Sequence, residues 1–253
     1  MDVRSKLIGS FSRSLAIGLG TSAIAWAAAS VPAFWTQASI DDAAQQILIG
    51  ESFDGQQLNR LRTRLIAISG GSARSLALAN VAVVRLRLLE VGSPPSSHLQ
   101  VNDHSEAVEA VDEALSGAPS NSFLWLAGYW LQELKSDRAD HGLQLLKMSY
   151  EFGPREAWIA VRRSPLALRM FSILPPELTV ASTTEFVGLM RAGLYEDAAN
   201  ILAGPGWPIR EMLIGKLAGI GEDDRRRLGK ILDAKDLPGS ELLRLKKPEA
   251  ILE

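Results

Sequence analysis

The sequence predicts an all-α protein, with one long apolar helix at the N-terminus followed by many shorter helices. After residue 38, apolar residues recur at three- and four-residue spacing, which places them on one face of a helix. No segment combines alternating apolar and polar residues with the turn residues that are typical of paired strands. Glycine and proline pairs separate the helical segments, so most of the predicted helices are short.

The first predicted element is a transmembrane helix over residues 14–36, preceded by a basic cytoplasmic N-terminus over 1–13. No charged residue lies between Arg13 and Asp41, and a helix over 14–36 is long enough to cross about 30 Å of hydrocarbon. Basic residues precede the segment and none follows it before Arg60, so the positive-inside rule leaves the N-terminus in the cytoplasm. We therefore expect a single-pass inner-membrane protein whose C-terminal domain lies in the periplasm.

The same segment also fits a signal peptide that is cleaved. Ala27-Ala28-Ala29 and Val31-Pro32-Ala33 both offer the small residues of a cleavage site. The uncharged run is longer than the apolar region of about 7–15 residues in a typical signal peptide, which favours a retained anchor. If cleavage occurs, the remainder of the chain is secreted to the periplasm.

The exported part is predicted to be helical over 39–236. Ser39 and Asp54 are suited to begin helices, because their side-chain oxygens can accept hydrogen bonds from the first turn. The residues 237–253 contain two prolines and a glycine and are predicted to form a flexible tail. Helices are predicted over 39–49, 54–68, 72–90, 103–116, 120–135, 139–152, 154–163, 165–172, 176–192, 194–203, 208–219 and 222–234.

Short helices cannot each bury an apolar face alone, so we expect consecutive helices to pack as antiparallel pairs. Three segments carry signs of such pairs. The first has small residues between Ala107 and Pro119, the second has large residues before Gly153-Pro154, and the third is Gly193-x-Tyr195-x-x-Ala198. These segments resemble the tetratricopeptide repeat, in which one helix presents large residues and its partner presents alanine at the crossing. The resemblance covers about residues 100–205 and implies an α-solenoid of helical hairpins suited to protein–protein interaction. The alternative is an irregular helical domain.

A second resemblance concerns three segments of the second half: NSFLWLAGYWLQ (121–132), GPREAWIAVRR (153–163) and ILAGPGWPIRE (201–211). They resemble uncharacterised membrane-anchored helical proteins of alphaproteobacteria that are associated with polysaccharide-production gene clusters. The resemblance implies a role in envelope polysaccharide production or export and brings no catalytic residues with it.

Composition and motifs point away from several classes of protein. The net charge of −2 gives no strong field for nucleic acid, so no nucleic-acid partner is expected. The absence of cysteine excludes disulfides and thiolate metal sites. His98 and His104 flank a predicted loop without the tight ligand spacing of a zinc motif. The chain has neither a G-x-S-x-G motif nor a phosphate-binding loop, so we expect no catalytic residue, no cofactor and no metal.

Four residues in GPREAWIAVRR are candidates for partner or anion binding, namely Arg155, Trp158, Arg162 and Arg163. Arginines beside an aromatic ring can hold a peptide carboxylate, an acidic polymer or lipid headgroups. Pro165 is expected to break the helix that carries them. The alternative is that these arginines form structural ion pairs with neighbouring acids.

Trp207, in the turn Gly204-Pro205-Gly206-Trp207-Pro208, is a further candidate for partner binding. Its alternative role is to pack over the core beside the turn. Earlier in the chain, six arginines between Arg60 and Arg87 precede five acids between Asp103 and Glu113. We interpret these two groups as neighbours that pair with each other.

The sequence therefore predicts a membrane-anchored periplasmic scaffold or adaptor that binds a protein partner in the cell envelope, in polysaccharide production or export. One alternative is a periplasmic enzyme acting on glycans, which needs two acids facing each other across a cleft. Another is a protein that binds an anionic polysaccharide through Arg155, Arg162 and Arg163.

Overall fold

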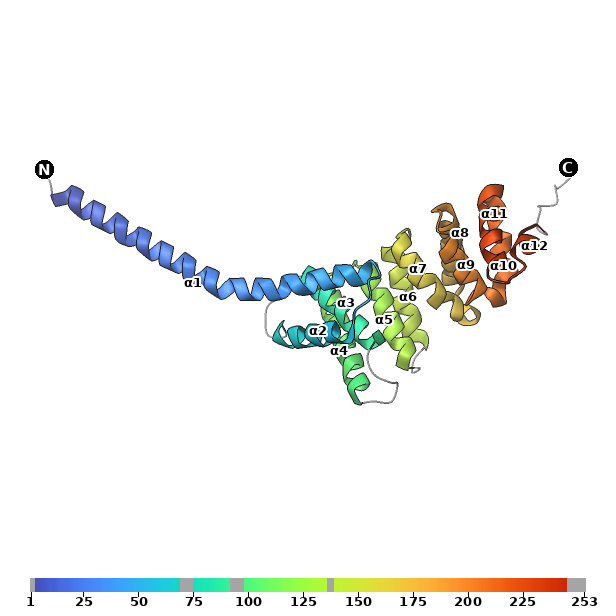
Figure 1. Ribbon diagram of the computed structural model, residues 1–253, viewed down its shortest axis with the longest axis horizontal. Helices are drawn as coiled ribbons and strands as arrows, with labels where there is room; N and C mark the ends of the chain where they lie inside the picture. Colours follow the sequence, from blue (N-terminus) through green and yellow to red (C-terminus); the bar gives the residue numbers. More distant parts are fainter. Residues whose placement is uncertain (1–2, 69–74, 92–97, 136–138, 245–253) are drawn as a thin grey trace. The chain divides into compact units, whose positions relative to one another are not determined.

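The computed structural model describes the backbone of residues 3–68, 75–91, 98–135 and 139–244 (Figure 1). Within these ranges the structure does not describe the side chains of 3–17, 29–36, 67–68, 75–76, 98–101, 135, 139–140, 239–240 and 244. Over the described ranges the protein has twelve α-helices and no strand, so the predicted all-α class is confirmed. The chain divides into two compact units, Met1–Gly117 and Ala118–Glu253, whereas the sequence predicts one domain over 39–236.

The first helix, α1 (Val3–Leu48), is continuous through Ser39. The prediction of a separate helix beginning at Ser39 is therefore wrong, because residues 36–39 contain no glycine or proline that would end the preceding helix. The predicted end is confirmed: Gly50 has φ +87°, and the N–H of Glu51 donates to the carbonyl of Gln46 (3.0 Å). This left-handed glycine closes the helix in the usual way.

The predicted transmembrane segment falls only partly within the described residues. Its side chains at 14–17 and 29–36, like those of the basic N-terminus, lie outside them. The side chains of 18–28 are exposed, including three large apolar ones: Leu19 (65%), Ile24 (71%) and Trp26 (73%). Among the residues that the structure describes, no helix is both long enough and apolar enough to span a bilayer.

In the first unit, α1 packs on α2 (Gly55–Ile68) and α3 (Ser75–Val91), and α3 packs on α4 (His98–Gly117). Asp54 begins α2 as predicted. The N–H of Gln57 donates to Asp54 Oδ1, and the N–H of Asp54 donates to Gln57 Oε1, both at 2.7 Å. This reciprocal pair satisfies two backbone donors at the start of the helix.

The predicted pairing of arginines with acids is confirmed for two pairs in this unit. Arg62 Nη2 lies 2.7 Å from Asp103 Oδ2, and Arg85 forms an ion pair with Glu106. Burial raises the pKa of Asp103, and the nearby Arg62 acts in the opposite direction.

The described residues of the second unit form eight α-helices, and several helices that follow each other along the chain pack as pairs: α5 with α6, α7 with α8, and α11 with α12. Helix α9 packs on both α8 and α11. The bounds are α5 Ser122–Lys135, α6 Ala139–Phe152, α7 Ala157–Arg169, α8 Pro176–Arg191, α9 Tyr195–Ala203, α10 Arg210–Lys216, α11 Glu222–Asp233 and α12 Gly239–Arg244.

Two predicted boundaries in this unit are wrong. Pro165 does not break the chain into two helices but lies inside α7, because buried residues on both sides of it hold the helix against its neighbours. The predicted flexible tail from 237 contains α12, and Leu237, Leu242 and Leu243 pack against the core. Residues 245–253 lie outside the described part of the chain.

The turn between α8 and α9 determines how these two helices pair. Gly193 has φ +76°, a conformation that a side chain disfavours, and the N–H of Leu194 donates to the carbonyl of Leu189 (3.0 Å). Ala198 on α9 is fully buried in the same cluster as Phe186 and Leu189 of α8. Helix α9 therefore covers one face of α8, and the opposite face of α8 remains exposed.

Candidate binding groove

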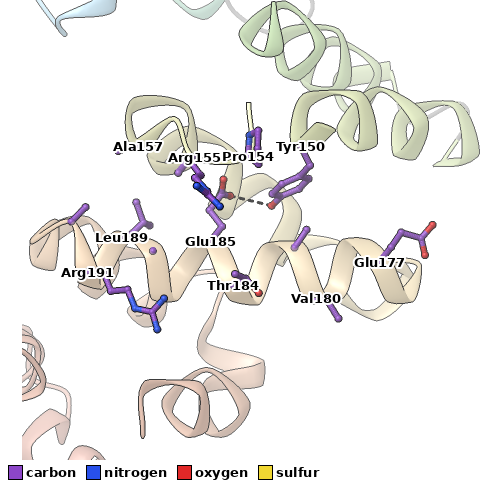
Figure 2. Close-up of a pocket in the computed structure, with 14 residues that line it drawn as sticks. Tyr150, Pro154, Arg155, Ala157, Glu177, Val180, Thr184, Glu185, Leu189 and Arg191 are labelled. Carbon is purple, nitrogen blue, oxygen red and sulfur yellow. Dashed lines mark hydrogen bonds between the residues drawn. The ribbon is translucent and has the colours of Figure 1, made fainter. Parts of the chain in front are cut away.

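A groove of about 760 Å³ lies between α8 and the turn that connects α6 to α7 (Figure 2). Tyr150 at the end of α6, Pro154 and Arg155 in the turn, and Ala157 at the start of α7 line one wall. Helix α8 lines the other wall. All of these residues belong to the second unit.

The sequence of α8 accounts for the character of its wall. Exposed residues recur at three- and four-residue spacing from Glu177 through Thr184 and Gly188 to Arg191. The opposite face carries Phe186 and other buried apolar residues. The exposed face is built mainly from small side chains, so it leaves room for a ligand above the helix.

Charged side chains lie at the two ends of this wall. Glu177 is in the first turn of α8 and Arg191 is in its last turn, so each is placed favourably in the helix dipole. Arg155 faces the groove from the opposite wall (Figure 2). Neither arginine has an ion-pair partner among the described residues. Two cationic groups are therefore available to a ligand in the groove.

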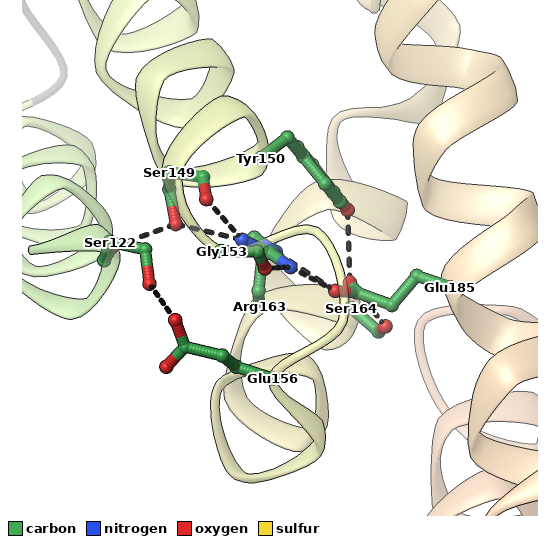
Figure 3. A network of polar contacts seen from close by, with 8 residues as sticks. All are labelled: Ser122, Ser149, Tyr150, Gly153, Glu156, Arg163, Ser164 and Glu185. Atoms are coloured by element: carbon green, nitrogen blue, oxygen red, sulfur yellow. Dashed lines mark hydrogen bonds and ion pairs between the residues drawn. The ribbon is translucent and has the colours of Figure 1, made fainter. Parts of the chain in front are cut away.

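A buried ion pair between Arg163 of α7 and Glu185 of α8 lies beneath the groove (Figure 3). The Arg163 side chain is 0% exposed and that of Glu185 is 4% exposed. Glu185 Oε1 accepts from Arg163 Nε at 2.9 Å and also from Arg163 Nη2. The pair joins the two helices that form the groove.

The other donors of Arg163 bind the end of α6 and the turn that follows. Nη1 donates to the carbonyl of Ser149 (2.6 Å) and to its hydroxyl (3.0 Å), and Nη2 donates to the carbonyl of Gly153 (2.9 Å). The guanidinium also stacks on the ring of Tyr150, 4.0 Å from its centroid. One arginine thus connects α6, the α6–α7 turn, α7 and α8.

The second oxygen of Glu185 is also fully engaged. Oε2 accepts from the Tyr150 hydroxyl (3.1 Å) and from the Ser164 hydroxyl (2.9 Å). Burial, and then the neighbouring carboxylate of Glu185, raise the pKa of Tyr150 well above its usual value. The phenol is therefore protonated at neutral pH. Both oxygens of Glu185 and the hydroxyl of Tyr150 are thus engaged within the protein.

Gly153 allows the turn to approach α5. A Cβ atom at this position would lie 2.2 Å from Ser122 Oγ, closer than any real contact. Ser122 in turn donates to Glu156 Oε1 (3.3 Å), which fixes the other end of the turn. The turn that carries Arg155 is therefore held on both sides.

Of the predicted site residues, Arg155 lines the groove and Arg163 does not face solvent at all. The prediction that Arg163 contributes to an exposed binding surface is corrected here. Its carboxylate partner Glu185 lies on the neighbouring helix, so Arg163 forms a structural ion pair, which was the alternative to ligand binding.

The other three predicted residues lie outside the groove lining. Trp158 is 43% exposed, and Arg162 donates to its carbonyl (2.8 Å) and lies 5.9 Å from its ring centroid. Trp207 is half-buried, with the guanidinium of Arg210 over its ring at 4.7 Å. The five predicted residues therefore do not form one site.

No three His, Asp or Glu side chains come together as a metal site within the described residues. The His98 side chain lies outside these residues. His104 is half-buried on α4.

Sequence reasoning missed Glu185, Thr184 and Arg191 in the groove. A signal for Glu185 was present, because it lies on α8 in a row of apolar residues at helical spacing, next to Phe186. An acid in such a row predicts a buried cationic partner. The exposed residues Thr184 and Arg191 carry no comparable signal.

The chain matches no protein-family model, no curated protein and no solved structure.

Proposed function

We propose that the protein is a membrane-anchored scaffold or adaptor of the periplasm that binds a protein partner in the groove on α8. The groove is the observation that supports this proposal most directly. Its volume of about 760 Å³ lies within the range of roughly 300–1,000 Å³ that is usual for ligand sites. It offers arginines without ion-pair partners in the described chain and a lining of small side chains, and its buried acid is already paired.

The proposed architecture is a set of tetratricopeptide-like hairpins, in which exposed helix faces bind partners. Two features support it. Gly193 makes a left-handed turn between α8 and α9, and Ala198 is fully buried four residues after the last residue of that turn. In the pair formed by α5 and α6, Gly142 of α6 faces Tyr129 of α5, with 3.5 Å from its Cβ position to the ring. A small residue on the second helix at the crossing is the arrangement expected of this repeat.

Anchoring in the inner membrane is proposed from the N-terminal sequence and from the exposed face of α1. Leu19, Ile24 and Trp26 are each more than 60% exposed, so no described part of the protein covers them. Apolar surface of this kind gains about 25 cal/mol per Å² when it leaves water. A bilayer around 14–36 supplies that environment, with the N-terminus in the cytoplasm. A role in envelope polysaccharide production or export is proposed from the sequence resemblance alone.

An anionic polysaccharide is the second candidate for the ligand, because Arg155 and Arg191 both face the groove without ion-pair partners in the described chain. A glycan-acting enzyme is the third. It requires a pair of free carboxylates, and of the two acids that line the groove, Glu185 is bound to Arg163.

Partner capture by the full chain in its native membrane tests the proposal. Gly188 lies on the groove wall with open space at its Cβ position, so Gly188→Phe fills the groove without disturbing the core. Asn200→Phe, at an exposed position of α9, is the matched control. After chemical crosslinking, we expect the same partner with the wild type and with Asn200→Phe, and at least tenfold less of it with Gly188→Phe. Equal recovery from all three proteins contradicts the proposal.

A further inference from the structure

We infer that the groove on α8 binds an extended segment of the partner polypeptide, with acidic residues toward Arg155 and Arg191 and a basic residue toward Glu177. This inference rests on the proposed function and adds the conformation and the charge pattern of the bound segment.

The length of the groove matches that of a short extended segment. From Glu177 to Arg191, α8 rises about 21 Å at 1.5 Å per residue. An extended chain of about six residues has the required length at 3.3 Å per residue.

The residues in the middle of the groove allow a polypeptide backbone to approach. Gly188 has nothing within 4 Å of its Cβ position, and Ala181 and Ala192 also line this wall. The exposed hydroxyl of Thr184 lies among them and can bond to a peptide group. The backbone of the segment can therefore approach α8 at this point.

The charges of the groove set the order of charged residues along the segment. Glu177 and Arg191 lie at opposite ends of the α8 wall, and Arg155 extends from the other wall between them (Figure 2). Glu185 adds no net charge because Arg163 neutralises it. The groove therefore has two available cations and one anion, and a segment with the opposite pattern complements it. Arginine is suited to carboxylates because its guanidinium can form two parallel hydrogen bonds.

Selection of phage-displayed random dodecapeptides on the full chain in detergent micelles tests the inference. Selected peptides are then titrated by fluorescence anisotropy against the wild type, Arg191→Glu and Arg169→Glu. Arg169 is an exposed arginine of α7 outside the groove lining, so it controls for the change in net charge. We expect selected peptides with Asp or Glu at one end.

The expected result is binding at least tenfold weaker to Arg191→Glu and little changed for Arg169→Glu. A peptide whose acid is replaced by lysine should bind Arg191→Glu better than it binds the wild type. Selected peptides without acidic residues, or equal binding to all three proteins, overturn the inference. So does the selection of no peptide while polygalacturonate, an anionic polysaccharide, binds in a manner that depends on Arg155 and Arg191.

These results are distinguishable from failure of the proposed function. If Gly188→Phe abolishes partner capture but the peptides show no acidic preference, the proposed function stands and the inference fails. If partner capture does not depend on the groove, the proposed function fails whatever the peptides show.

Discussion

Replacement of Arg163 by methionine removes the side chain that connects the four segments around the groove. Arg163 is 0% exposed and Glu185 is 4% exposed, so solvent cannot compensate the carboxylate that is left behind. Breaking a buried ion pair in this way typically costs about 3–5 kcal/mol. For a unit of this size that free energy corresponds to a decrease in Tm of roughly 10–20 °C.

A double-mutant cycle shows how much of this loss comes from the unpaired charge. Glu185→Gln keeps an oxygen that accepts from Tyr150 and Ser164 but carries no charge. We expect the double variant Arg163→Met/Glu185→Gln to recover about half of the loss, with a coupling energy of roughly 1.5–3 kcal/mol.

Equilibrium unfolding of the full chain in detergent, followed by circular dichroism and tryptophan fluorescence, measures each variant. The two signals are compared because a chain of two compact units need not unfold in one transition. A loss below about 1 kcal/mol for Arg163→Met, or strict additivity in the double variant, would refute the account of this ion pair.

Three further predictions concern stability. Gly153→Ala should lower the free energy of unfolding by about 1–3 kcal/mol because the added Cβ meets Ser122. Gly188→Ala, in open space on a helix, should raise it by about 0.5–1 kcal/mol. Urea unfolding in which both changes have the same effect contradicts this pair of predictions. Gly193→Ala should lower the free energy of unfolding by about 1–2 kcal/mol because the φ of Gly193 is +76°. An unfolding midpoint equal to that of the wild type refutes the assigned turn. The folded pKa of Tyr150 lies above the unfolded value of 10.0, so its contribution to stability is constant below pH 10 and is lost as pH rises above it. Absorbance at 295 nm should therefore show tyrosine ionisation in the native protein above pH 10, and half-ionisation of all tyrosines at pH 10 argues against burial of Tyr150.

Local signals in the sequence predicted several elements correctly. Asp54 begins α2 and Gly50 follows α1, because each feature depends only on residues within one or two turns of the helix. Helix α6 has the predicted bounds, 139–152. The pairing of Arg62 with Asp103 was also predictable, since opposite charges were grouped in two segments of the chain.

Features that depend on tertiary contacts were not predictable in the same way. The proline at 165 ends a helix by local rules, but α7 is held against α8 on both sides of it. Arg162 and Arg163 are adjacent in sequence, yet about 100° of helical rotation places one at the surface and the other in the core. Which of them is buried depends on the position of Glu185, 22 residues later.

The groove itself depends on two segments separated in the sequence. The turn at Gly153–Glu156 meets α8 because Arg163 binds both the carbonyl of Gly153 and the carboxylate of Glu185. No spacing within either segment encodes this contact. The candidate Arg155 was found from its residue type, whereas Arg191 and Glu177 acquire meaning only from their positions along the groove.

Site-specific photo-crosslinking from Thr184 tests the central claim, that the groove on α8 holds a partner polypeptide. A photoreactive residue is introduced at Thr184, at the middle of the groove, and separately at Asn200 outside it, in the full chain in its native membrane. The account predicts a crosslinked polypeptide from position 184 that is lost when Arg155 and Arg191 are both changed to glutamate, and none from position 200. The absence of a crosslink at 184, or one that persists in the double variant, would contradict it.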